Sequence, residues 1–160
     1  MKQIKPILTA VTSALLAAPL VALAAPGEPA AAPNVWVAQI KVSRGIVRIE
    51  RAGQRFPGPV GARLKVDDSV ISESNGSAGL TFSDNSTLSM GPDSEVTLKR
   101  FEYDPTTHMG AFDAYVKQGT VSLQAGNLAD SGPDNLRITT PQSELRGNAK
   151  QLLISTGESK

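Results

Sequence analysis

The 160-residue sequence contains no cysteine, which excludes disulfide bonds and thiolate metal sites. Small exported domains often use disulfides to compensate for a thin hydrophobic core, so this chain must rely on packing and backbone pairing instead. Aromatic residues make up only 4% of the sequence. We therefore expect a core built mainly of valine, isoleucine and leucine.

Histidine occurs only once, as His108, and the sequence has no Gly-x-Ser-x-Gly motif. Nucleophilic catalysis usually needs a nucleophile beside a base, most often histidine, with a third group that orients the base. Asp67 and Asp68 are adjacent, so in an extended strand they would point to opposite faces rather than form an acid-base pair. The sequence therefore predicts a non-enzymatic protein without a cofactor or a metal.

Neither sign of charge dominates the composition. The chain has 16 basic and 15 acidic residues, a net charge of +1. Removal of Lys2 and Lys5 with an N-terminal leader would leave 14 against 15, or −1. Generic nucleic-acid binding depends on a surplus of lysine and arginine, so no nucleic-acid partner is expected.

The N-terminus has the pattern of an export signal. Lys2 and Lys5 precede an apolar run over residues 7–24 that ends in Ala22-Leu23-Ala24, a small-x-small cleavage site. We predict a helical signal peptide over residues 1–24, cleavage, a periplasmic product and no stable membrane insertion afterwards. Secretion or an uncleaved N-terminal anchor are the alternatives, because the run nearly reaches the roughly 20 residues that span a bilayer.

The rest of the chain divides into three parts. Residues 25–34 are rich in alanine and proline and are predicted to form an extended linker. Residues 35–156 form the predicted domain, and residues 157–160 a C-terminal tail. About 135 residues remain after the signal, which suffices for one domain with its own core.

Alternation of apolar and polar residues at period two predicts strands throughout the domain. A two-residue turn at Arg44-Gly45 would form a hairpin that pairs Val42 with Val47 and places Lys41 opposite Arg48. Segments rich in glycine and proline, residues 53–61 and 127–135, are expected to be loops. The predicted strands are residues 38–43, 47–50, 64–66, 70–72, 80–82, 88–90, 96–98, 101–103, 112–116, 120–125, 136–140 and 151–155. No segment outside the leader has helical periodicity, so the fold class is all-β.

A step of eight residues recurs in the middle of the domain. Leu80-Thr81-Phe82, Leu88-Ser89-Met90 and Val96-Thr97-Leu98 repeat an apolar, hydroxyl, apolar pattern. A meander and a three-sided β-solenoid both fit this step. The connecting residues are Asp84, Asn85, Ser86, Gly91, Pro92, Asp93 and Ser94. Their two carboxylates are few for calcium, which favours turns that bond their own backbone over a metal site.

Basic residues cluster in the N-terminal third of the domain. Glu50 is the single acidic residue between positions 41 and 65. The candidate binding residues are Lys41, Arg44, Arg48, Arg51 and Arg55, with Arg63 and Lys65 continuing the cluster. An anionic glycan, lipid headgroup or acidic protein surface could bind this positive field. The alternative is a solvated face that protects strand edges from aggregation.

An ordered series of motifs resembles the FecR-like domain of bacterial envelope proteins. The series comprises Gly61-x-x-Leu64, Asp68-x-x-Ile71, Ala78-x-Leu80-x-Phe82-x-Asp84-Asn85-Ser86-x-Leu88-x-Met90-Gly91-Pro92-x-Ser94, Phe101-x-Tyr103-Asp104-Pro105, Val116-x-x-Gly119, Ile138-Thr139-Thr140-Pro141 and Arg146-Gly147. Two positions depart from the family pattern: Asn85 replaces a glycine, and Asn148 replaces a threonine after Arg146-Gly147.

The resemblance implies a single small β-solenoid-like domain, with a β-sandwich or meander as the alternative. It further implies a periplasmic sensing or recognition module that binds a protein or envelope ligand. Together with the basic cluster, this makes an envelope protein or an anionic glycan the expected partner. Thr140, Pro141, Arg146 and Gly147 are the terminal family motif. A structural module that assembles through β-strand edges is the alternative function, and the oligomeric state stays open.

Overall fold

The computed structural model describes residues 35–130, 132 and 134–157. The predicted signal peptide (1–24) and linker (25–34) lie outside the described residues, as do residues 158–160 of the predicted tail. In the described ranges, no helix has the length and apolar character needed to cross a membrane. Nearly all regular structure there is β, so the all-β prediction is confirmed.

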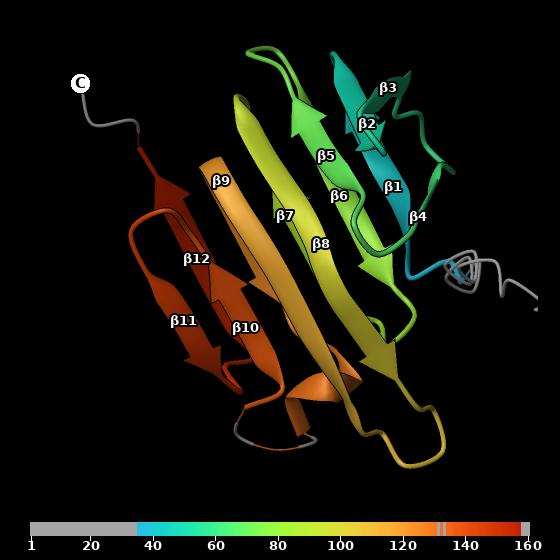
Figure 1. Cartoon of the computed structure of the whole chain (residues 1–160), viewed down its shortest axis with the longest axis vertical. Helices are drawn as coiled ribbons and strands as arrows, with labels where there is room; N and C mark the ends of the chain where they lie inside the picture. Colours follow the sequence, from blue (N-terminus) through green and yellow to red (C-terminus); the bar gives the residue numbers. More distant parts are fainter. Residues whose placement is uncertain (1–34, 131, 133, 158–160) are drawn as a thin grey trace, which may run out of the picture. The chain divides into compact units, whose positions relative to one another are not determined.

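Twelve strands and one short 3-10 helix make up the domain (Figure 1). They are β1 (Ala38–Arg44), β2 (Val47–Arg51), β3 (Gln54–Pro57), β4 (Arg63–Leu64), β5 (Ser69–Ser72), β6 (Ser77–Phe82), β7 (Thr87–Met90), β8 (Ser94–Tyr103), β9 (Gly110–Gln124), η1 (Asn127–Asp130), β10 (Leu136–Thr139), β11 (Glu144–Gly147) and β12 (Gln151–Thr156). Sheet A has the order β4-β1-β6-β7-β9-β12, and sheet B the order β3-β2-β5-β8-β9-β10-β11.

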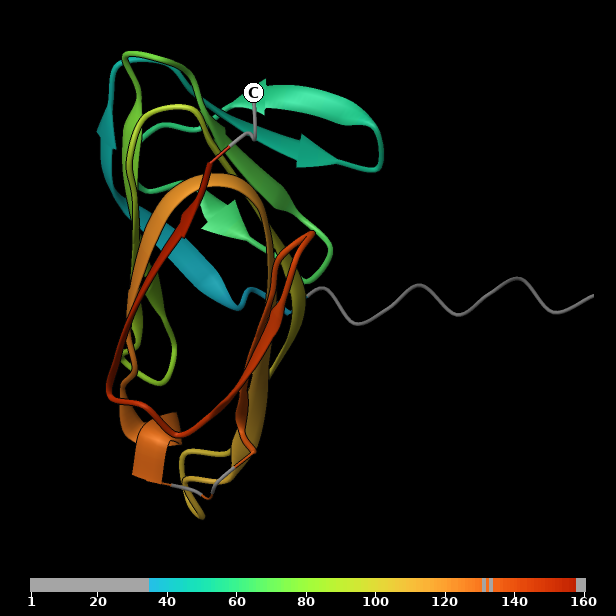
Figure 2. The ribbon, with the colours of Figure 1, turned by 90° about the vertical axis from the view of Figure 1, so that its left-hand side faces the viewer.

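The long strand β9 belongs to both sheets and joins them into one curled, open half-barrel. Figure 2 shows β9, in orange, arching from one layer into the other. The connections β1 to β2, β3 to β4, β4 to β5, β5 to β6, β7 to β8 and β11 to β12 likewise cross from one sheet to the other. Four of these passages lie next to one another as a stack: β1 to β2, β5 to β6, β7 to β8 and the bend of β9.

Backbone hydrogen bonds fasten each crossing to its neighbour. The N–H of Glu73 donates to Ile46 O at 3.0 Å, that of Asp93 to Glu73 O at 3.2 Å, and that of Gly91 to Thr120 O at 2.9 Å. These bonds satisfy polar groups at corners where the strand ladders end. The corners therefore act as a continuous rim that holds the two sheets together.

Two buried serines extend this rim with their side chains. The Ser72 hydroxyl donates to Gly91 O at 2.6 Å and accepts from the N–H of Ser94 at 3.2 Å. The Ser94 hydroxyl donates to Pro92 O at 3.1 Å and accepts from the N–H of Thr120 at 3.1 Å. Both serines are 2% exposed or less. Ser72 and Ser94 thus tie successive crossings to one another.

The bend of β9 depends on Gly119. Its φ is +92°, and a Cβ at this position would lie 2.5 Å from the Cα of Ser94 and closer still to its hydroxyl oxygen. Only glycine combines this backbone conformation with so close an approach of two chains. Residues 120–124, beyond the bend, pair with β7 and β12 instead of β8.

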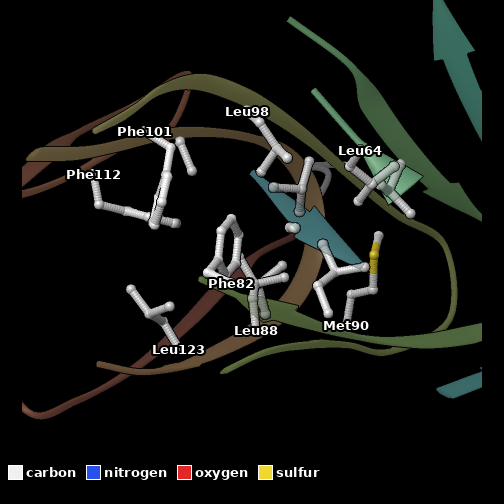
Figure 3. Packing of buried hydrophobic residues seen from close by; sticks show 14 of the residues in the cluster. Leu64, Phe82, Leu88, Met90, Leu98, Phe101, Phe112 and Leu123 are labelled. Carbon is white, nitrogen blue, oxygen red and sulfur yellow. The ribbon is translucent and has the colours of Figure 1, made fainter. Parts of the chain in front are cut away.

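The hydrophobic core fills the space between the two sheets (Figure 3). Phe82 lies at its centre, with its ring centroid 5.2 Å from that of Phe101 and 4.9 Å from that of Phe112. Leu88 and Leu123 from sheet A and Leu98 from sheet B extend the cluster. Three of the few aromatic side chains therefore pack against one another in a single cluster.

The predicted hairpin at Arg44-Gly45 is wrong. β1 pairs with β4 and β6, whereas β2 pairs with β3 and β5 in the other sheet, so Lys41 does not face Arg48. Gly45 instead turns the chain across the core, where a Cβ on it would collide with the backbone of Asn75. Periodicity cannot separate this crossing from a hairpin, because both keep the apolar residues on the inner face.

The eight-residue step corresponds to two different connections. β6 and β7 form a hairpin, with Leu80 opposite Leu88 and Ala78 opposite Met90, which keeps the apolar residues on the inner face. β7 and β8 are in different sheets. A solenoid would stack parallel strands of successive coils, whereas only β9 and β10 pair in parallel in the described chain. The solenoid expectation is therefore not met.

Three smaller differences concern segment assignments. Gln54–Pro57 is a strand inside a predicted loop, and residues 112–116 and 120–125, expected as two strands, lie in one bent strand that ends at Gln124. In the other predicted loop, η1 buries Leu128 and Ala129. The pairing of β8 with β9 has a register shift between Leu98 and Arg100.

Candidate functional site

Two of the predicted basic residues lie on sheet B and are neutralised locally. Arg48 forms an ion pair with Glu73 at 2.7 Å, and Arg55 forms one with Glu50 across the β2-β3 pair at 2.7 Å. The two arginines line a hollow of about 430 Å³ that also contains Phe56. Each arginine charge is thus balanced by a glutamate, and little net positive charge remains on this part of sheet B.

Arg51 lies farther along β2 and bonds to a buried carboxylate. Its Nε and terminal nitrogen donate to both oxygens of Asp68 at 2.7 and 2.6 Å, and Asp68 is 1% exposed. The backbone N–H of Lys65 donates to the same carboxylate at 2.8 Å. These hydrogen bonds to Asp68 raise the pKa of Arg51. The residue predicted to bind a partner is therefore held in place by the fold.

Trp36 lies beside this pair with its ring flanked by cations. The guanidinium carbon of Arg51 is 5.5 Å from the ring centroid and the ammonium nitrogen of Lys65 is 4.7 Å from it. Both distances are within the range of cation–π attraction. The ring nevertheless stays 41% exposed, so it remains accessible at the surface.

A shallow groove of about 350 Å³ runs from Trp36 over β1, β4 and β6. Its lining residues are Trp36, Val37, Ala38, Gln39, Lys41, Arg63, Thr81, Phe82, Ser83 and Asn85. We call this surface the Trp36 groove. The set includes two cations, several hydrogen-bonding side chains and no carboxylate.

The two cations of the Trp36 groove have no acidic partner in the described part of the chain. No carboxylate oxygen there lies within 4.0 Å of the side-chain nitrogens of Lys41 or Arg63. The backbone oxygen of Arg63 accepts a hydrogen bond from Arg51 at 3.3 Å. Lys41 thus belongs to the groove, whereas the predicted residue Arg44 lies opposite Ser77, outside it.

The turn at Asp84-Asn85-Ser86 satisfies its own oxygen atoms. The buried Asp84 carboxylate accepts from the backbone N–H of Ser86 at 2.9 Å and from its hydroxyl at 2.5 Å. Ser86 Oγ in turn accepts from Gly126 N–H at 2.9 Å, and Asn85 has a φ of +66°. This is an Asx turn that anchors the hairpin to the segment after β9.

The other two predicted motifs also lie at corners. Gly91, Pro92, Asp93 and Ser94 form the crossing from β7 to β8. Thr140 and Pro141 begin the turn between β10 and β11, where Thr140 Oγ1 accepts from Ser143 N–H at 2.9 Å. Arg146 and Gly147 lie on β11, and the hydrogen bond from Arg146 lowers the pKa of Glu144. None of these motif residues lines the Trp36 groove.

His108 is in the exposed loop between β8 and β9. Its ring meets Tyr103 edge to face, with 6.2 Å between the centroids. Over the described ranges, no group of three or more histidine, cysteine, aspartate and glutamate side chains could hold a metal ion.

Sequence reasoning did not place Trp36, Thr81 or Asn85 in a site. The groove exists because β1 pairs with β4 on one side and with β6 on the other, which brings Gln39 beside both Arg63 and Thr81. If the pairing of β1 with β6 had been predicted from the sequence, the polar residues Gln39 and Thr81 would have indicated a shared polar face. Comparisons with family models, with curated proteins and with solved structures gave no match to this chain.

Proposed function

We propose that the protein is an exported, non-enzymatic recognition module of the FecR-like type, which binds an anionic envelope glycan through the Trp36 groove. The observation that carries the proposal is the charge of Lys41 and Arg63, which no carboxylate of residues 35–130, 132 or 134–157 pairs with, in a groove whose lining has no carboxylate. Carboxylate or sulfate groups on a polysaccharide would complement these cations. Export and the periplasmic location rest on residues 1–24, and the mature chain is expected to begin at Ala25.

The surroundings of the two cations suit a sugar chain. Gln39, Thr81 and Asn85 add amide and hydroxyl groups along the groove, and such groups hydrogen-bond sugar hydroxyls. The groove is open, so an extended polymer can lie across it without entering a cavity. Trp36, braced by Arg51 and Lys65, forms one end of the surface.

Trp36 is the single tryptophan of the sequence, so its fluorescence reports on the groove directly. Titration with a polyuronate should change this emission, while neutral dextran of similar length should not. Salt should weaken the binding, because exposed charges are screened over about 8 Å at 0.15 M ionic strength. Each cation–carboxylate contact contributes up to about 1 kcal/mol, so loss of both cations should weaken binding by up to about thirtyfold.

The decisive variant is Lys41→Ser with Arg63→Ser. Its matched control is Lys117→Ser with Lys150→Ser, which removes the same charge from exposed lysines outside the groove. Equal affinity of both double variants for the polyuronate would refute the assignment of the groove. If the polyuronate has no effect but an acidic envelope protein binds and the first variant alone loses it, the ligand class is protein.

A further inference from the structure

The half-barrel has exposed edge strands, and most of them have features that hinder pairing with another chain. β3 carries Arg55 and Pro57, β4 has only two residues, and β11 carries Glu144 and Arg146. Charges, prolines and short strands are the usual protection of an exposed edge against pairing with another chain. These three edges are therefore unsuited to pairing with another strand.

β12 is different among the described edge strands. Its sequence, Gln-Leu-Leu-Ile-Ser-Thr over Gln151–Thr156, has no charge, no proline and no glycine. It pairs with β9 on one side only, and the structure assigns no strand to its other side. Figures 1 and 2 show β12 at the margin of the domain, on the side where the half-barrel is open. An edge of this kind invites another strand.

The backbone of β12 presents regularly spaced groups to its free edge. The N–H of Ala125 donates to Lys150 O at 2.9 Å, which marks a hydrogen-bonded pair of the ladder. Bonded and non-bonded pairs alternate in an antiparallel ladder, so Leu152 and Ile154 direct their backbone groups toward β9. Gln151, Leu153 and Ser155 therefore direct theirs toward the free edge.

Leu153 is at the middle of this edge and is 73% exposed. Its ladder partner on β9 is Ser122, so its side chain stands on a polar outer surface. Ile154, the next residue, is only 5% exposed and points into the core. Packing within the domain thus explains Ile154, whereas Leu153 lines a shallow hollow with Leu145 of β11 and stays mostly exposed.

We propose that β12 is a homodimer interface, in which β12 of a second copy adds antiparallel to this edge about a two-fold axis at Leu153. The register is self-complementary. Leu153 meets its counterpart in a hydrogen-bonded pair, Gln151 meets Ser155, and no charged residues of the strand oppose one another. Two-fold dimers are the commonest oligomers because one patch serves both subunits.

The dimer would join the two A sheets into one continuous sheet. A contact of about six residues on each chain is smaller than a standard protein interface, so association is expected to be reversible and concentration-dependent. The interface goes beyond the proposed glycan recognition. Because β12 and the Trp36 groove lie at opposite ends of sheet A, each can fail without the other.

Sedimentation analysis of the purified protein over a hundredfold concentration range tests the interface. The apparent mass should rise toward twice that of one chain, and Leu153→Lys should hold it at one chain. Met109→Lys is the matched control, because Met109 is 63% exposed in the loop between β8 and β9. Leu153→Pro should also stay monomeric and fold, because the N–H it removes points away from β9.

A cysteine variant tests the register. The chain has no cysteine, and Cα atoms in a hydrogen-bonded antiparallel pair are about 5.5 Å apart, within the range a disulfide can span. Oxidised Leu153→Cys should form a covalent dimer much faster than Met109→Cys. A wild-type protein that stays monomeric throughout, or lysine variants that lower association equally, would overturn the proposal.

Discussion

Replacement of Gly119 by alanine should destabilise the protein strongly, because this residue bends β9 between the two sheets. Alanine at a φ of +92° costs about 1–3 kcal/mol in backbone strain. The added Cβ would also meet the buried Ser94, whose Cα is 2.5 Å away, and overpacking of this kind costs about 1–3 kcal/mol more. We expect a total loss of about 2–6 kcal/mol in the free energy of unfolding.

Gly53 supplies the matched control. It lies in the turn between β2 and β3 with a φ of +76°, and a Cβ there would have no neighbour within 4 Å. Gly53→Ala therefore carries the backbone strain without the collision, at about 1–2 kcal/mol. Urea unfolding followed by Trp36 fluorescence measures both variants.

The difference between the two variants isolates the contact with Ser94. We expect Gly119→Ala to lose at least about 1 kcal/mol more than Gly53→Ala. Equal decreases in the free energy of unfolding would mean that β9 and the β7–β8 crossing can separate to make room for the Cβ without destabilising the protein. In that case the stacked crossings would not be the feature that holds the sheets together.

Two further substitutions probe the hairpin and the core. Asp84→Ala should lower the free energy of unfolding by about 2–4 kcal/mol, because it leaves both the backbone N–H and the hydroxyl of the buried Ser86 without their acceptor. Urea unfolding measures this change. A decrease below about 0.5 kcal/mol would contradict the Asx-turn account. Phe82→Ala should cost about 3–5 kcal/mol, because the ring contacts two other phenylalanines at the centre of the core. Thermal unfolding measures this loss, and a nearly unchanged transition would refute the central place of Phe82.

The strands of this protein were largely predictable where one face is buried, whereas β3 and β11, which bury no residue, were not predicted. Val47 and Ile49, or Val96 and Leu98, alternate with polar neighbours over short runs and turn inward as expected. The connections between strands were not predictable from this pattern. A crossing at Gly45 and a hairpin at the same residue produce the same alternation, and only the partner strands distinguish them.

The candidate site was predictable only in part for the same reason. Lys41 was expected in a basic cluster with Arg48, but the crossing at Gly45 places the two residues on different sheets. Ion pairs with Glu73 and Glu50 neutralise Arg48 and Arg55, and these acids lie 25 and 5 residues away in sequence. A local count of charges cannot detect partners that only the fold brings close.

The participation of β9 in both sheets has a consequence for hydrogen exchange. Ala114 and Val116 are buried in the part of β9 that pairs with β8, and Val121 in the part that pairs with β7 and β12. Neither sheet can open along this strand without exposing the other, so the amides on both sides of the bend should exchange together, at the free energy of global unfolding. The half-barrel would then behave as a single cooperative unit despite its two layers, with β9 as its slowest-exchanging segment.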